Sequence, residues 1–472
     1  MARLKDDNEG NVSFRSTEYL VNSDLLKELA RDLTQKRPSR EPVLHAKICL
    51  LLSEFTRKAL HVQGGSFQVG DGMIRDYLGP REGYAVIKAL RERGVINRVE
   101  KKIVGARCDS YRICDSMMMS KPAEYKMKKF SDAHKRVNEV ISKITAFHQQ
   151  SRDEDHKRYA EGLTKFRYNP TECREVLAGT EGMRAGSIKW ICQAMTVRDH
   201  NECFGASGRF VRLSVGTTGR VYHPACTMKE SIRKRGLISV DGEETRVRSL
   251  DIKSSQPAIL AALLIRVSGQ GPEQSILNTP EAKARLKAAG GKELLLDEAL
   301  DRREVSRFVD IIENGDIYEF LSDKSEELLG WRPARSTAKV SFLRDVIAKR
   351  GKYEPKDIEL AFKTHFPSIY GYIRRVNKGS HSRLIRMLQW AESEVVFRFV
   401  WKAVTDRTGL PLMTVHDGFY CHEDAAEHLV LTVSQASDML GVRLRLVESK
   451  DGRKELIERR SNLEDIRRLL NG

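Results

Sequence analysis

No apolar run in the 472-residue sequence approaches the roughly 18–20 residues that a membrane-spanning helix needs. The first ten residues, MARLKDDNEG, lack the apolar core of a secretory signal. None of the eight cysteines forms a CxxC pair, which removes the usual signature of a structural zinc site. Internal repeats and low-complexity tracts are also missing. We therefore expect a soluble, cytoplasmic protein with reduced thiols and no membrane partner.

The 65 Asp and Glu are too few to balance the 82 Lys and Arg, so the net charge is +17 and the isoelectric point is about 9.4. Between residues 331 and 409, 17 Lys and Arg stand against 7 Asp and Glu. A surplus of this size attracts polyanions and gives salt-dependent affinity for nucleic acid. The alternative is a solvated helical face, but such faces usually mix signs. We expect a nucleic acid partner, DNA in the first place and RNA as the alternative.

The N-terminal third suggests a small DNA-binding module. Residues 1–40 are polar apart from one amphipathic stretch, Tyr19 to Leu33. Helical spacing of apolar residues follows at 44–60, more briefly at 70–79, and at 81–94, where Gly94 suits the C′ position. Residues 95–113 alternate like two strands around a turn at Gly105. Three helices and a β-hairpin predict a winged helix over residues 41–116.

In a winged helix the third helix enters the major groove, and basic wing residues meet phosphates. Here those residues would be Lys101, Lys102 and Arg107. The alternative is a small α/β module that binds protein. Residues 117–212 have helical propensity only, and we interpret them as a helical linker or thumb-like region.

Two aspartates in the last part of the chain, 213–472, follow strand-like segments. Asp251 ends the strand VRSLDI and precedes an apolar helix, and His416 and Asp417 occupy the tip of a hairpin in LPLMTVHDGFYCH. Two carboxylates brought together repel each other and need a cation. Mg²⁺, or Mn²⁺, suits such a pair. The alternative is that both are ordinary turn or capping residues.

A basic pair lies between the two aspartates. Arg335 and Lys339 in RPARSTAKVSFLRDVIAKRG are four residues apart, so both project from one face of a helix. That face could hold the phosphates of a nucleotide. Taken alone, the spacing also fits an ordinary surface pair.

Residues 213–450 resemble the palm and fingers of family-A DNA polymerases and of single-subunit phage-type RNA polymerases. The segments that carry this resemblance are, in order, TTGRVYHP, LDIKSSQPAILAALL, GDIYEFL, RSTAK and VHDGFYCH.

The resemblance implies a role for each matching residue. Asp251 and Asp417 would be metal ligands, with the backbone of Ile252 as a further contact. Arg335 and Lys339 would bind the triphosphate. The residues implied to contact nucleic acid are Arg220 on the duplex, Gln389 on the template–primer and His416 at the primer end.

Two departures from the family bear on sugar selection. Family-A DNA polymerases carry a glutamate after the first aspartate motif that blocks a ribose 2′-hydroxyl, and residues 255–258 contain none. Ile347 stands where the family has a tyrosine, two turns after the lysine. Both departures remove features that discriminate against ribose, so the sequence leaves the choice between deoxyribonucleotides and ribonucleotides open.

These patterns together predict an α+β protein. A polymerase-type palm with small helical fingers would follow an N-terminal winged-helix domain and a helical, thumb-like region. We expect a Mg-dependent nucleotidyltransferase, a template-directed DNA polymerase or primase-polymerase of a mobile element, phage or plasmid that uses nucleoside triphosphates. The alternatives are an untemplated terminal nucleotidyltransferase and a non-enzymatic replication initiator with a vestigial palm.

Overall fold

The computed structural model describes about three quarters of the chain. The described residues are 4–6, 11–14, 19–21, 23–35, 37–59, 66–69, 74, 77–79, 82–100, 109–114, 118–123, 126–128, 135, 139, 153–179, 193, 197, 200–201, 213–291, 294–349, 354–450 and 453–457.

The chain divides into two compact units that interleave along the sequence. The first unit comprises residues 1–152, 167–212 and 223–235, and the second comprises 153–166, 213–222 and 236–472. This grouping places one helix of the predicted thumb-like region in the second unit.

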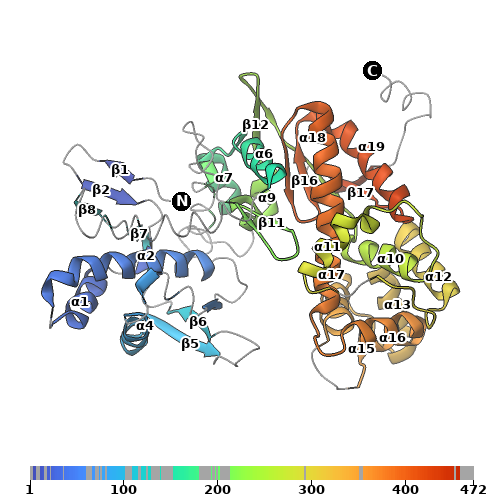
Figure 1. Ribbon diagram of the computed structural model, residues 1–472, viewed down its shortest axis with the longest axis horizontal. Coiled ribbons are helices and arrows are strands. Elements are labelled where there is room, and N and C mark those ends of the chain that lie inside the picture. Colours follow the sequence, from blue (N-terminus) through green and yellow to red (C-terminus); the bar gives the residue numbers. More distant parts are fainter. Residues whose placement is uncertain are drawn as a thin grey trace. The chain divides into compact units, whose positions relative to one another are not determined.

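Helices and small sheets are mixed in both units (Figure 1). The predicted α+β class is thus confirmed, whereas its division into palm, fingers and thumb stays a prediction. Among the described helices, none is long and apolar enough to cross a bilayer.

The first unit contains short strands and a cluster of helices. Its elements are β1 (Leu4–Asp6), β2 (Asn11–Phe14), β3 (Tyr19–Val21), α1 (Ser23–Leu33), η2 (Pro38–Arg40), α2 (Glu41–Ala59), β4 (Ser66–Val69), α4 (Gly83–Glu92), β5 (Ile96–Glu100), β6 (Asp109–Ile113), β7 (Met118–Ala123), β8 (Lys126–Lys128), α7 (Pro170–Ala178), η4 (Pro224–Thr227) and α9 (Glu230–Arg233).

The predicted helices at 44–60 and 81–94 are found as α2 and α4. Gly94 has φ +66°, a left-handed conformation that suits a glycine after a helix end. The strands β5 and β6 pair antiparallel, and β4 adds on the other side of β6, giving the order β4-β6-β5. The core that joins these elements reaches back to α1, where Leu26, Leu29 and Ala30 are completely buried. Gly105 and most of 70–79 lie outside the described residues.

The second unit has a five-stranded antiparallel sheet in the order β15-β16-β14-β17-β18. The strands of the whole second unit are β10 (Ser214–Val215), β11 (Val221–Tyr222), β12 (Leu237–Val240), β13 (Glu243–Arg246), β14 (Arg248–Ile252), β15 (Leu412–Val415), β16 (Gly418–Cys421), β17 (Leu446–Lys450) and β18 (Arg453–Ile457). The two residues of β9 (Phe166–Arg167) are divided between the two units.

The second unit also contains most of the described helices. They are α6 (Glu154–Leu163), α10 (Ser255–Val267), η5 (Ile276–Asn278), α11 (Pro280–Ala288), α12 (Arg302–Asn314), α13 (Ile317–Leu329), α14 (Arg335–Ser341), η6 (Phe342–Ile347), α15 (Asp357–His365), α16 (Pro367–Val376), α17 (Arg383–Ser393), η7 (Glu394–Trp401), α18 (Lys402–Thr408) and α19 (Glu423–Leu440). Eleven of the thirteen residues of α10 are buried, as expected for a helix that is apolar on all sides.

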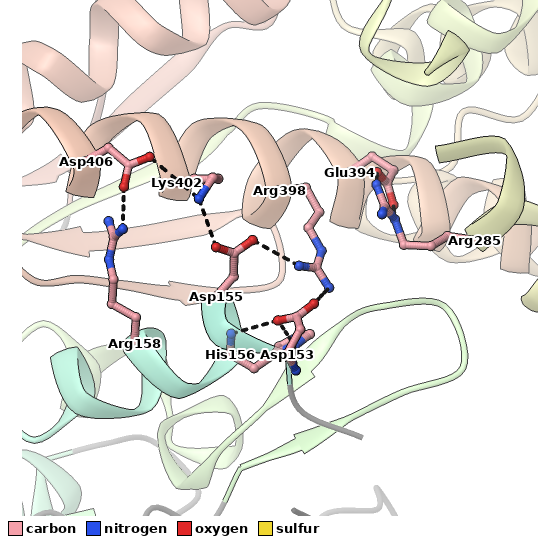
Figure 2. A network of polar contacts seen from close by, with 9 residues as sticks. All are labelled: Asp153, Asp155, His156, Arg158, Arg285, Glu394, Arg398, Lys402 and Asp406. Carbon is pink, nitrogen blue, oxygen red and sulfur yellow. Dashed lines mark hydrogen bonds and ion pairs between the residues drawn. The ribbon is translucent and has the colours of Figure 1, made fainter. Parts of the chain in front are cut away.

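The elements α17, η7 and α18 follow one another as one continuous helix, in which η7 is π-helical. Figure 2 shows α6 lying along this helix, joined to it by ion pairs. Arg398 contacts Asp153 at 2.6 Å and Asp155 at 3.1 Å, and Lys402 contacts Asp155 at 2.9 Å. Arg158 pairs with Asp406 in the same row. These ion pairs therefore fix α6 to the α17–α18 helix within the second unit.

Tyr159 anchors α6 from its apolar side. Its ring packs edge-on against Phe397 at 5.3 Å and Trp401 at 5.4 Å. Its hydroxyl oxygen accepts a hydrogen bond from the backbone N–H of Thr414 at 2.9 Å, and it lies 3.1 Å from the carbonyl oxygen of that residue. Because Thr414 belongs to β15, this contact ties α6 directly to the sheet.

We predict that Tyr159→Ala destabilises the protein by about 3–5 kcal/mol, since it removes a buried aromatic side chain. Tyr159→Phe should cost about 1–3 kcal/mol, because the Thr414 N–H loses its acceptor in a buried position. Chemical denaturation followed by circular dichroism measures both. Lys157→Ala, on the exposed side of α6, is the control and should change stability by less than about 0.5 kcal/mol. Equal stability of all three variants would contradict this role of α6.

Candidate functional site

The pairing of β14 with β16 brings the two predicted aspartates together. The antiparallel register sets Asp251 opposite Gly418, the residue that follows Asp417. The backbone N–H of Ile252 donates to the carbonyl oxygen of Asp417 at 3.0 Å. Both aspartates therefore lie at the same end of two neighbouring strands. His416 and Asp417 form the β15–β16 turn, and His416 adopts a left-handed φ of +57°.

Gly418 makes room for the Asp251 carboxylate. A Cβ atom at this position would lie only 2.5 Å from the Asp251 Oδ1 atom, closer than any real contact of this kind. The glycine is required by this close approach and not by its own φ. A side chain at residue 418 would push the carboxylate of Asp251 away from its neighbour.

Burial raises the pKa of Asp417 to about 7, from an ordinary value of 3.8. The negative charges of Glu392 and Asp251 raise this pKa further, whereas a backbone hydrogen bond and the positive charge of Lys339 act in the opposite direction. Asp417 therefore lies in an excess of negative charge that a cation would relieve.

Glu392 is a third carboxylate that the sequence did not reveal. It is 2% exposed on α17, and its Oε1 atom accepts from Ser255 Oγ at 2.8 Å and from Gln256 Nε2 at 3.1 Å. A glutamate in the mostly apolar stretch WAESEVVF was the available signal, because a buried charge needs partners. Glu392 joins α17 to the turn that follows Asp251.

Arg220, the predicted duplex contact, forms an ion pair with Glu392. The preceding Gly219 has φ +78°, and a Cβ there would meet Ser393 Oγ at 2.9 Å. Arg220 is held tightly against α17, with 15% of its side chain exposed. Its position is therefore fixed by the fold before any ligand binds.

A cavity of about 20 Å³ lies beside this ion pair, large enough for one water molecule. The residues that line it are Arg220, Val221, Glu392, Ser393, Val396, Phe397, Thr414 and His416. The His416 ring also packs edge-on against Tyr222 at 5.9 Å. Gln389 is half-buried on the same helix as Glu392.

The basic pair is exposed on α14. Arg335 donates to the Asp316 Oδ2 atom from Nε at 3.0 Å and from Nη2 at 2.8 Å, and its guanidinium lies 5.3 Å from the centre of the Tyr318 ring. Because the charge of Lys339 acts on Asp417, the pair faces the same region as the carboxylates. Asp316 and Tyr318 are further members of the site that residue spacing did not identify.

The helix after the basic pair changes its winding. From Phe342 to Ile347 it is π-helical, and Ile347 is completely buried. Lys339, eight residues earlier, is exposed, so the two side chains lie in different surroundings. The predicted wing contacts Lys101, Lys102 and Arg107 lie outside the described residues.

Comparison with known proteins adds little. No family model matches the chain, and no curated protein matches it. Among solved structures it is similar to the POL domain of Pol1 from M. smegmatis in a complex with DNA primer-template and dNTP, at 15% identity and a TM-score of 0.29. The match covers 58% of this chain and 54% of that chain, so it spans about half of that structure's length. A likeness this slight assigns no residue and no reaction.

We predict that ionisation of Asp417 destabilises the metal-free protein. A carboxyl whose pKa is raised on folding contributes stability below pH 4, and this contribution is lost as the pH rises through about 7. With a chelator present, Asp417→Asn should therefore have a higher melting temperature than the wild type at pH 8, and lose this advantage at pH 4. The shift should be about 2–4 °C for each kcal/mol.

Asp438→Asn, which removes an exposed carboxylate on α19, is the matched control and should follow the wild type at both values of pH. A melting temperature of Asp417→Asn that tracks the wild type throughout would show that the carboxyl is not destabilised by its surroundings.

Proposed function

We propose that the protein is a Mg-dependent nucleotidyltransferase, a template-directed polymerase or primase-polymerase that adds nucleotides to a 3′-hydroxyl. The observation that supports this proposal is the β14–β16 register, which sets Asp251 beside Asp417. Two carboxylates at one sheet end, facing a basic helix, suit the charge distribution of phosphoryl transfer.

The chemistry of the donors fits Mg²⁺. Asp251 and Asp417 offer hard carboxylate oxygens, and the backbone of Ile252 lies between them. Among the described residues no three His, Cys, Asp or Glu side chains form a closed metal site. A bound Mg²⁺ pair would activate the 3′-hydroxyl and neutralise the leaving pyrophosphate.

The remaining residues of the site bind and orient the reactants. Arg335 and Lys339 would hold the phosphates of the incoming nucleotide, where charge develops on the leaving group. Arg220, held by Glu392, would contact the primer–template duplex. His416 would contact the primer end, beside Asp417, and Gln389 would face the template–primer.

The N-terminal module would recruit the enzyme to duplex DNA. Its order α2, β4, α4, β5, β6 and its sheet order β4-β6-β5 support the winged-helix prediction. The third helix of such a module, here α4, would enter the major groove, while Lys101, Lys102 and Arg107 would contact phosphates.

Primer extension with Mg²⁺ and labelled nucleotides tests the function. We expect Asp251→Asn and Asp417→Asn each to lower the rate at least a thousandfold, because neither amide can neutralise a cation. Both variants should keep the circular dichroism spectrum of the wild type. Normal synthesis by both variants would refute the proposal, and a homopolymer that ignores the template sequence would identify untemplated addition.

Gly418→Ala offers an independent test. The added Cβ displaces the Asp251 carboxylate, so the rate should fall at least tenfold, as for an error of about 1 Å in the placement of a reacting group. Gly162→Ala is the matched control, since its Cβ meets nothing closer than 3.8 Å. Full activity of Gly418→Ala would show that the position of the Asp251 carboxylate is not critical.

A further inference from the structure

Asp316 is the centre of a second polar cluster in this unit. It precedes α13 and caps this helix by accepting from the Tyr318 N–H at 3.0 Å. Its Oδ2 atom accepts both hydrogen bonds from Arg335 and lies 4.0 Å from the Lys253 Nζ atom. The side chain of Asp316 is 14% exposed, so these contacts are partly shielded from water.

Arg445 adds a third cation. It lies just before β17, and its carbonyl oxygen accepts from the Lys253 N–H at 2.8 Å, which sets the two residues side by side. Its guanidinium donates to the carbonyl oxygen of Gly315, the residue before Asp316.

The charges in this cluster do not balance. Arg335 is hydrogen-bonded to Asp316, Lys253 lies 4.0 Å from it, and Arg445 is near enough for the charges of both Asp316 and Glu313 to act on it. The next carboxylate, Glu313, accepts from the backbone N–H of Arg443 at 2.6 Å, and Arg443 carries a further positive charge. Like charges held together at half-buried positions repel each other, and a polyanion would relieve this repulsion.

The cluster adjoins the aspartate pair. Lys253 follows Asp251 by two residues at the end of β14. Tyr318 is close enough to Asp316, Arg335 and Asp417 for all three charges to act on its hydroxyl, whose pKa is raised mainly by burial. A chain of phosphates bound at the cluster would therefore begin beside the carboxylates.

We propose that Lys253 and Arg445, together with Arg335, form an oligophosphate-binding site in which Asp316 is the resident counter-ion. Asp316 pairs with Arg335 and Lys253 while the site is free, and a bound phosphate chain would replace it as their partner. The ligand class is a nucleoside triphosphate, an assignment that rests on the proposed nucleotidyl transfer. Binding of a simple polyphosphate at the same residues does not require catalysis.

Isothermal titration of the full-length protein in the presence of a chelator tests this site. The ligands are inorganic tripolyphosphate, ATP, dATP and a single-stranded oligonucleotide. We expect Lys253→Met and Arg445→Met each to weaken tripolyphosphate and nucleotide binding about tenfold, because each loses a charge-assisted hydrogen bond. The oligonucleotide affinity should change less than about twofold.

Asp316→Asn tests the counter-ion separately. Asparagine caps a helix as well as aspartate does, so α13 should keep its start. Removing the competing charge should strengthen tripolyphosphate binding severalfold. Lys283→Gln is the matched control, since it removes an exposed positive charge on α11, outside the cluster, and should change binding less than about twofold.

Tripolyphosphate binding that is unchanged in both Lys253→Met and Arg445→Met would overturn the inference. If Lys253→Met and Arg445→Met lose oligonucleotide binding but keep the tripolyphosphate affinity of the wild type, the inference is also overturned. The cluster would then be a site for a nucleic acid backbone. Failure of the proposed function looks different, because the protein would not extend primers yet would still bind polyphosphate through Lys253 and Arg445. Circular dichroism of each variant confirms that it is folded.

Discussion

The antiparallel pairing of β14 with β16 is the constraint on which the site depends. It joins two segments about 165 residues apart and leaves their aspartates at one edge of the sheet. Gly418 permits this approach because any larger residue would occupy the place of the Asp251 carboxylate. The same register places the negative charge of Asp251 near Asp417, and the charge of Glu392 on α17 adds to the repulsion that raises the pKa of Asp417.

Part of this arrangement could be predicted from local sequence. Apolar strand segments that end in aspartate indicated Asp251 and Asp417, and helical periodicity indicated α2 and α4. Glu392 could not be found in this way, since its partners lie far away in the chain, and Asp316 lies in the GDIYEFL segment but had no role assigned to it. Residues 342–347 show a different limit, because regular periodicity does not reveal that the helix is π-helical there.

The basic composition of residues 331–409 has two structural explanations. Arg398 and Lys402 neutralise aspartates of α6, and Lys349 forms a buried pair with Glu359 at 2.7 Å. These charges hold the fold together. Arg335 and Lys339 are exposed beside the carboxylates instead, so the location of a cation in the fold, and not its count in the sequence, separates scaffold from candidate binding surface.

The interleaving of the two units has a practical consequence for dissecting the protein. Residues 153–166 belong to the second unit, although parts of the first unit follow them in the chain. A fragment cut at residue 213 would therefore lose α6 and expose the aromatic surface that Tyr159 covers. Neither unit can be obtained by a single truncation, so the contribution of each unit is best tested by point substitutions in the intact polypeptide.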